Sequence, residues 1–186
     1  MAVHTGPVLA LMALLAVAGV TKLRSPGTTA GALEAAGFPH SRLAVRLLGL
    51  FEVAVGLVGI VRGGWVASFA GAVLYASFAL FVFHILRNRL SISSCGCLGA
   101  AETPPSIVHV VVNLAAAATL VYAMISPIGP WGGLAGAPLG ESLPLAAFTG
   151  VTIYLLYAVI AVLPRGRALR SHTSIGLSPT RARSNP

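Results

Sequence analysis

The sequence predicts an all-α integral membrane protein, a bundle of about five transmembrane helices. Apolar residues make up 56% of the 186-residue chain and charged residues only 9%, whereas soluble domains carry roughly one-quarter charged residues. The mean hydropathy of +0.90 exceeds what a soluble core of this length needs. The apolar residues are also gathered into stretches that approach the length of a membrane span.

Five such stretches cover residues 7–21, 43–61, 65–86, 107–125 and 143–163. The connections between them are too short for an independent core, so residues 1–164 are expected to form one domain. The first stretch also resembles a secretory signal, with a small-residue cleavage site at 16–18. We expect it to be retained as a span, because no positive charge precedes it and Lys22 and Arg24 follow it directly.

The distribution of basic residues predicts the orientation in the membrane. Once five spans are drawn, eleven of the twelve Lys and Arg residues fall on one side, and only Arg62 falls on the other. The positive-inside rule makes the basic side cytoplasmic. We therefore expect a multi-pass plasma-membrane protein with its N-terminus outside and its C-terminus inside.

The C-terminal tail, residues 165–186, is basic and rich in Ser, Thr and Pro. Its apolar residues show no helical period, which predicts a disordered cytoplasmic segment held near anionic lipid by charge. The net charge of +8 could suggest a nucleic-acid partner. We expect none, because no aromatic residues are interleaved with the arginines and the basic residues elsewhere flank the spans, where lipid head groups meet them.

Cys95 and Cys97 are separated by one glycine in the connection after the third span, and they are the chain's two cysteines. The flexible glycine lets two thiols this close approach bonding distance, and the strained bond would be easily reduced. This spacing favours a redox pair. Two alternatives stay open: a zinc site completed by His84 and His109, for which the spacing is unusual, and two small apolar residues without chemistry.

Glu52 is the only acid within a predicted span, near the bilayer centre, where an ionisable group is costly. It shares a helical face with Gly56 and Gly59, so it is expected to point into the bundle. A proton-transfer role and a packing role are both open for it. Lys22, at the end of the first span, is expected to snorkel to the head groups, or to pair with Glu52 or a thiolate.

Two further stripes of small and polar residues are expected to hold helices together. One joins His109 to Asn113 on the fourth span, and the other leads to Tyr75 on the third.

Together these residues resemble the MauE branch of the DoxX-like membrane proteins, over about residues 10–122. That branch carries a lysine, a membrane-embedded glutamate and a Cys-Gly-Cys-Phe-Gly signature on a four-helix core, to which this chain would add one helix. The matching residues are Lys22, Gly37-Phe38-Pro39, Glu52, Cys95-Gly96-Cys97-Leu98-Gly99 and Asn113. Leu98 replaces the signature's phenylalanine, and Val112 stands where a basic residue is expected.

The resemblance implies a redox-associated protein of methylamine utilisation. MauE is thought to work there with a thioredoxin-like partner in disulfide formation of methylamine dehydrogenase. The client in that pathway is extracytoplasmic, whereas the charge pattern puts the cysteines near the cytoplasmic face. Either electrons cross the bundle, for example through a quinone, or the uncharged cysteine connection dips inward.

Our leading hypothesis is therefore a thiol–disulfide relay, acting as an oxidoreductase or as an accessory to one. Cys95 and Cys97 would exchange electrons with a quinone or a partner thiol protein, Glu52 would accept protons, and Lys22 would stabilise a thiolate. One alternative is a non-catalytic scaffold that assembles through small-residue faces. Another is a solute path centred on Glu52, which would need more polar groups within the spans.

Overall fold

The chain folds into helices throughout the part that the computed structural model describes. That part comprises residues 5–90 and 105–125 together with Gly140, Leu143, Ala147 and residues 149–154. Its bounded helices are α1 (Thr5–Arg24), α2 (Pro26–Ala35), α3 (Arg42–Val61), α4 (Trp65–Arg87) and α5 (Ile107–Ile125). No strand occurs among these described residues, which confirms the predicted all-α class.

Four of these helices, α1, α3, α4 and α5, are long and apolar enough to cross a membrane. They correspond to the first four predicted spans, and α1 extends beyond its predicted range at both ends. The protein is therefore a multi-pass membrane protein. The fifth predicted span lies largely outside the described residues, as does the whole tail 165–186.

The described part of that fifth stretch, Leu143, Ala147 and residues 149–154, is helical. Its Thr152 lines a hollow together with Pro7 and Leu11 of α1 and Ala115 of α5. Thr152 thus lies at the α1–α5 side of the bundle.

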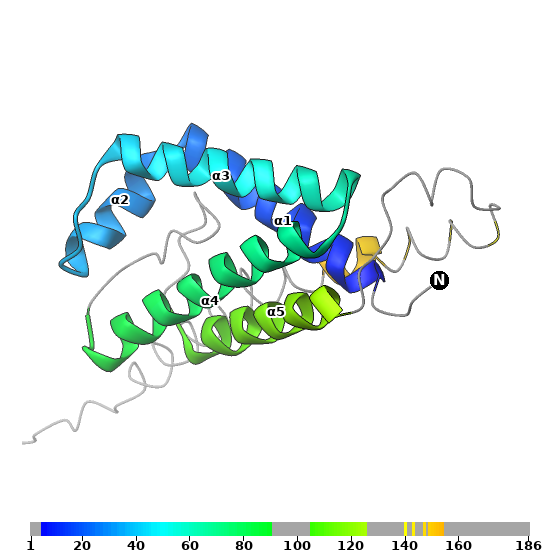
Figure 1. The fold of residues 1–186 in the computed structure, drawn as a ribbon. Coiled ribbons are helices and arrows are strands. Elements are labelled where there is room, and N and C mark those ends of the chain that lie inside the picture. Colours follow the sequence, from blue (N-terminus) through cyan, green and yellow to red (C-terminus); the bar gives the residue numbers. More distant parts are fainter. Residues whose placement is uncertain are drawn as a thin grey trace, which may run out of the picture.

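The four spans are arranged as two packed pairs, α1 with α3 and α4 with α5 (Figure 1). A tight turn through Gly63 and Gly64, both with positive φ, joins α3 to α4 and allows the chain to reverse. We call this the turn end of the bundle. At the opposite end, where the short helix α2 lies next to α3, α1 finishes, α3 begins, α4 finishes and α5 begins; we call this the α2 end (Figure 1).

Helix α1 is the most enclosed of the four spans. Within its most apolar window 61% of the residues are buried, against 33–39% in the other three spans. Its Val8, Met12 and Leu15 belong to the main apolar core together with Leu120 of α5. The stretch that resembled a secretory signal is thus a central element of the packed bundle.

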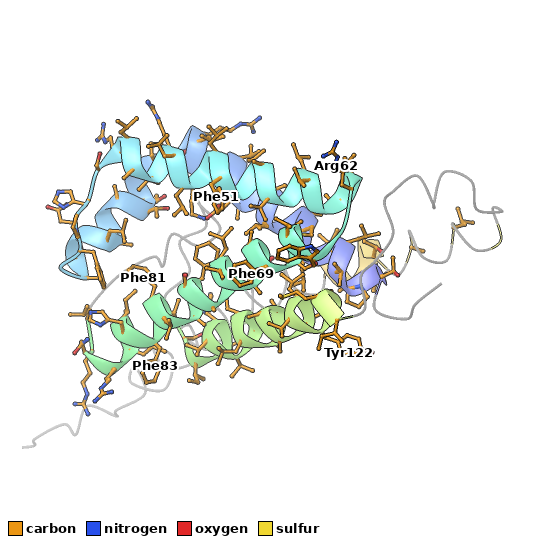
Figure 2. All side chains as sticks on the ribbon, viewed as in Figure 1. Phe51, Arg62, Phe69, Phe81, Phe83 and Tyr122 are labelled. Carbon is orange, nitrogen blue, oxygen red and sulfur yellow. The ribbon has the colours of Figure 1, made fainter. Side chains whose placement is uncertain are left out.

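The outer faces of the other spans carry large apolar side chains that meet lipid. Phe51, Phe69, Phe83 and Tyr122 are all about half exposed and point away from the helix contacts (Figure 2). Exposed apolar surface of this extent is what a bilayer solvates.

Helix α2 and the residues after it lie at the α2 end of the bundle, where Phe38 packs against α4. Pro26 occupies the first turn of α2, where its missing N–H leaves no helical hydrogen bond unmade. After α2 the positive φ of Gly37 redirects the chain. The Phe38 ring then packs 6.1 Å from that of Phe81 and 5.3 Å from that of His84, both on α4.

Candidate functional site

A buried ion pair joins two spans in the interior of the bundle. The Lys22 ammonium of α1 donates a hydrogen bond to Glu52 Oε2 of α3 at 2.9 Å and lies 2.9 Å from Oε1 as well. The Lys22 side chain is 2% exposed and that of Glu52 is not exposed at all. Among the described residues Oε1 accepts no hydrogen bond of good geometry, although the ammonium lies as close to it as to Oε2. The two opposite charges thus compensate each other in a part of the bundle that is closed to solvent.

The position of Glu52 along α3 places this pair near the middle of the bilayer. Arg42 begins α3 ten residues before Glu52, and Val61 ends it nine residues after. At 1.5 Å per residue these are about 15 Å and about 13 Å of helix, close to half of the roughly 30 Å hydrocarbon core on each side. A lone charge at this depth would cost several kcal/mol, so the pairing is what makes both charges tolerable.

Small residues bring α1 and α3 close enough for the pair to form. A Cβ atom added to Gly56 would lie 2.6 Å from the carbonyl oxygen of Met12 and 2.9 Å from Ala16, so only glycine fits there. Gly19 and Gly49 face each other in the same way one level nearer the α2 end. The predicted small-residue face of Glu52, Gly56 and Gly59 is confirmed, since all three are buried on one side of α3.

Lys22 points into the bundle rather than out of it, so the expectation that it snorkels to the head groups is wrong. Side chains on an α-helix tilt toward its N-terminus. Because Lys22 lies near the C-terminal end of α1, this tilt directs its stem back toward the membrane centre and Glu52. The alternative expectation, a pairing with Glu52, is confirmed.

The ring of Phe78 on α4 completes the surroundings of the ammonium, at 5.0 Å from Lys22 Nζ to the ring centroid. A cation over an aromatic face is stabilised by the ring quadrupole, most strongly where water is excluded. Sequence reasoning missed this residue, because a phenylalanine among apolar neighbours on a span carries no distinguishing signal. Phe78 ties α4 to the α1–α3 pair.

Tyr75, one turn before Phe78, acts as the packing element that its stripe predicted. Its hydroxyl donates to the Leu11 carbonyl oxygen of α1 at 2.7 Å, and its ring meets that of Phe78 edge to face at 6.3 Å. Ser68, Gly71 and Ala72 of the same stripe are buried too. α4 is therefore linked to α1 both by this hydrogen bond and through the Lys22–Phe78 contact.

The stripe on α5 also faces inward. His109 and Asn113 are buried, and the Asn113 amide donates to the His109 carbonyl oxygen at 2.7 Å. His109 Nδ1 lies 2.8 Å from Ser106 Oγ at the start of the helix. Both side chains lie in the half of the bundle toward the α2 end.

His84 and His109, the histidines considered for a zinc site, both have protein neighbours. The His84 ring packs against Phe38 and lies within hydrogen-bond distance of the Asn88 amide, and His109 meets Ser106. In residues 5–90, 105–125 and the described part of 140–154, no three His, Cys, Asp or Glu side chains gather around a common point.

Cys95 and Cys97 lie outside the described residues, so their predicted thiol chemistry stays a prediction. The chain leaves the described structure after Leu90 and re-enters it at Pro105, on either side of the cysteine connection. Leu90 follows α4 and Pro105 precedes α5, and both helix ends belong to the α2 end of the bundle. The described residues on either side of the cysteine connection therefore lie in the half of the bundle that holds Lys22 and His109.

The family relationship that the cysteine motif and its accompanying residues suggested is confirmed by a match to one protein family. The model of the family described as methylamine utilisation protein MauE matches residues 2–126. The chain belongs to the MauE family. The match spans α1 through α5, including the Lys22–Glu52 pair and the cysteine connection, and it ends one residue after α5. In this MauE-family protein the fifth apolar stretch and the basic tail thus lie beyond the family region.

No curated protein and no solved structure matches the chain.

Proposed function

We propose that this MauE-family protein is a membrane thiol–disulfide relay in which Cys95 and Cys97 cycle between dithiol and disulfide. Oxidation of the dithiol forms one S–S bond and releases two electrons and two protons. The two electrons and two protons pass to a quinone, which becomes a quinol, or to a partner disulfide, which becomes a dithiol. The family is described as a methylamine utilisation protein, and the resemblance given in the sequence analysis implies that such a step would serve disulfide formation in an enzyme of that pathway.

The observation that supports the proposal is the enclosed Lys22–Glu52 pair, in a bundle whose α2 end holds Leu90 and Pro105, the described residues on either side of the cysteine connection. A membrane protein retains a buried charge pair at considerable cost, and functional sites are where such pairs occur. A proton acceptor inside the bundle is what a dithiol needs when it is oxidised away from water. Glu52 suits that role, because Oε1 accepts no hydrogen bond of good geometry from the described residues.

In this proposal Lys22 holds Glu52 as a carboxylate while the dithiol is reduced, and it offsets the charge of a thiolate that approaches the pair. Phe78 holds the ammonium in place through its ring face. The proposed orientation in the plasma membrane puts the α2 end at the cytoplasmic side, because Arg24, Arg42 and Arg87 lie there.

Thiol trapping in intact membranes tests the relay directly. The chain has two cysteines, so a maleimide mass tag on the protein counts them without background. We expect no tag before reduction and two tags after it, and re-oxidation when a quinone is added. Cysteines that never react, or that stay reduced with every oxidant, would refute the relay.

Two variants separate the relay from the scaffold alternative. The Cys95→Ser, Cys97→Ser double variant should lose all activity in a client-oxidation assay, whereas a scaffold would tolerate it. Glu52→Gln should slow re-oxidation while leaving both thiols countable. The small-residue face proposed for scaffold assembly is also occupied within the chain, because Gly49 and Gly56 pack against α1.

A further inference from the structure

We propose that an anionic phospholipid binds with its head group at the outer edge of the contact between α1 and α3, here called the seam. The arginines that would bind it are named the arginine face and are Arg24, Arg42 and Arg46. This inference is independent of the proposed redox function. All three side chains are exposed, and all three belong to the α2 end of the bundle.

The packing of α1 on α3 places these arginines at one end of the same helix pair. Arg46 shares one stripe of α3 with Gly49 and Val53, at intervals of three and four residues. Gly49 and Val53 are the residues against which Gly19 of α1 packs, and the Leu23 backbone lies beside Gly49 as well. Arg24 is the last residue of α1 and follows Leu23 directly, so it lies at the same end of the α1–α3 contact as Arg46.

The acids in the described part of the chain supply no counter-charge for these three guanidinium groups. The described residues contain two acids, Glu34 and Glu52. Glu52 pairs with Lys22, and Glu34 lies 3.7 Å from His40. No described acid lies within 4.0 Å of an arginine of the face.

The surface next to the arginine face is apolar and faces lipid. Leu43, Leu47 and Leu50 of α3 are 66%, 58% and 57% exposed. Arg46 lies four residues inside the start of α3, about 6 Å deeper than Arg42, among these leucines. A phospholipid can reach an arginine at that depth from the bilayer itself, because it brings its phosphate together with its acyl chains.

The chemistry of guanidinium groups favours phosphate in particular. A guanidinium binds phosphate oxygens in a bidentate manner, and two of them one helical turn apart, such as Arg42 and Arg46, can hold one phosphate between them. A head group with net negative charge, such as phosphatidylglycerol, is attracted to three such groups more strongly than zwitterionic phosphatidylcholine. The leucines then accommodate the acyl chains.

Native mass spectrometry of the purified full chain, titrated with phosphatidylglycerol or phosphatidylcholine, tests this site. We expect tighter binding of phosphatidylglycerol. The Arg42→Gln, Arg46→Gln double variant should bind it roughly 25-fold more weakly, at about fivefold for each arginine removed. The matched control is Arg87→Gln, Arg89→Gln, which removes the same charge from the end of α4 and should retain nearly all of the affinity.

Three results would overturn the proposal. The control variant could lose as much affinity as the test variant, which would indicate general charge attraction. The two lipids could bind equally well, or inorganic phosphate at millimolar concentration could displace the lipid. The Arg42→Lys, Arg46→Lys variant guards against misfolding, because it keeps both charges and should recover much of the affinity that the glutamine variant loses.

Discussion

The Lys22–Glu52 pair allows a double-mutant cycle whose outcome can be estimated from the structure. The Lys22→Met variant leaves the Glu52 carboxyl in the bundle without its counter-charge. The least costly escape is for the carboxyl to take up a proton. From a reference value near 4.3, this costs roughly 4 kcal/mol at pH 7, at about 1.4 kcal/mol per pH unit. That figure agrees with the roughly 3 to 5 kcal/mol typical of a broken buried pair.

The pH dependence of the two single variants should have opposite signs. In Lys22→Met, folding requires a proton to be taken up, so the loss of stability shrinks by about 1.4 kcal/mol for each unit by which the pH falls from 7 toward 5. In Glu52→Gln, the buried ammonium must give up a proton, so the loss shrinks as the pH rises above 7. The double variant, with two neutral side chains of similar volume, should recover most of the stability.

Equilibrium unfolding in mixed detergent micelles, followed by tryptophan fluorescence between pH 5.5 and 8.5, measures these free energies. The Glu34→Gln variant is the matched control, because its contact with His40 is 3.7 Å long and exposed, and exposed pairs contribute little. A double variant as unstable as the two single losses added together would refute the pairing. So would single variants whose stability does not change with pH.

Three further variants test the packing around the pair, each through the same unfolding free energy. Gly56→Ala should cost about 1 to 3 kcal/mol, since its Cβ would meet the α1 backbone, while Gly31→Ala, with open space around it, should be neutral or stabilising. Phe78→Leu should cost roughly 1 to 2 kcal/mol through loss of the cation–π contact. Phe69→Leu, on the lipid face, should not show this loss of unfolding free energy. Tyr75→Phe should cost about 1 kcal/mol, the net contribution of one hydrogen bond to α1.

The membrane class and the first four spans could be predicted from the sequence because they depend on local properties. Hydropathy and length are summed along the chain, so α3 and α5 were located to within one residue of their observed ends. The inward face of Glu52, Gly56 and Gly59 was also predictable, since helical periodicity fixes which residues share a face. These features need no knowledge of a partner helix.

The partners of the buried groups were not predictable in the same way. Lys22 and Glu52 are thirty residues apart, and whether a lysine at a helix end turns inward depends on which helix lies beside it. Phe78 belongs to a third helix and carries no polar signal, so no pattern in the sequence distinguished it from the lipid-facing Phe69. Only the crossing of α1, α3 and α4 gave it a role.

The sequence alone therefore determined that the chain enters the membrane, where it crosses and which faces turn inward, because lipid and helical periodicity act on each segment separately. The tertiary structure alone decided that the first apolar stretch is a core helix, and that its terminal lysine neutralises a glutamate near the bilayer centre. The physical reason is that glycine contacts between α1 and α3 set a close approach that neither helix specifies by itself. A charge in hydrocarbon is tolerated only when that approach supplies its counter-charge.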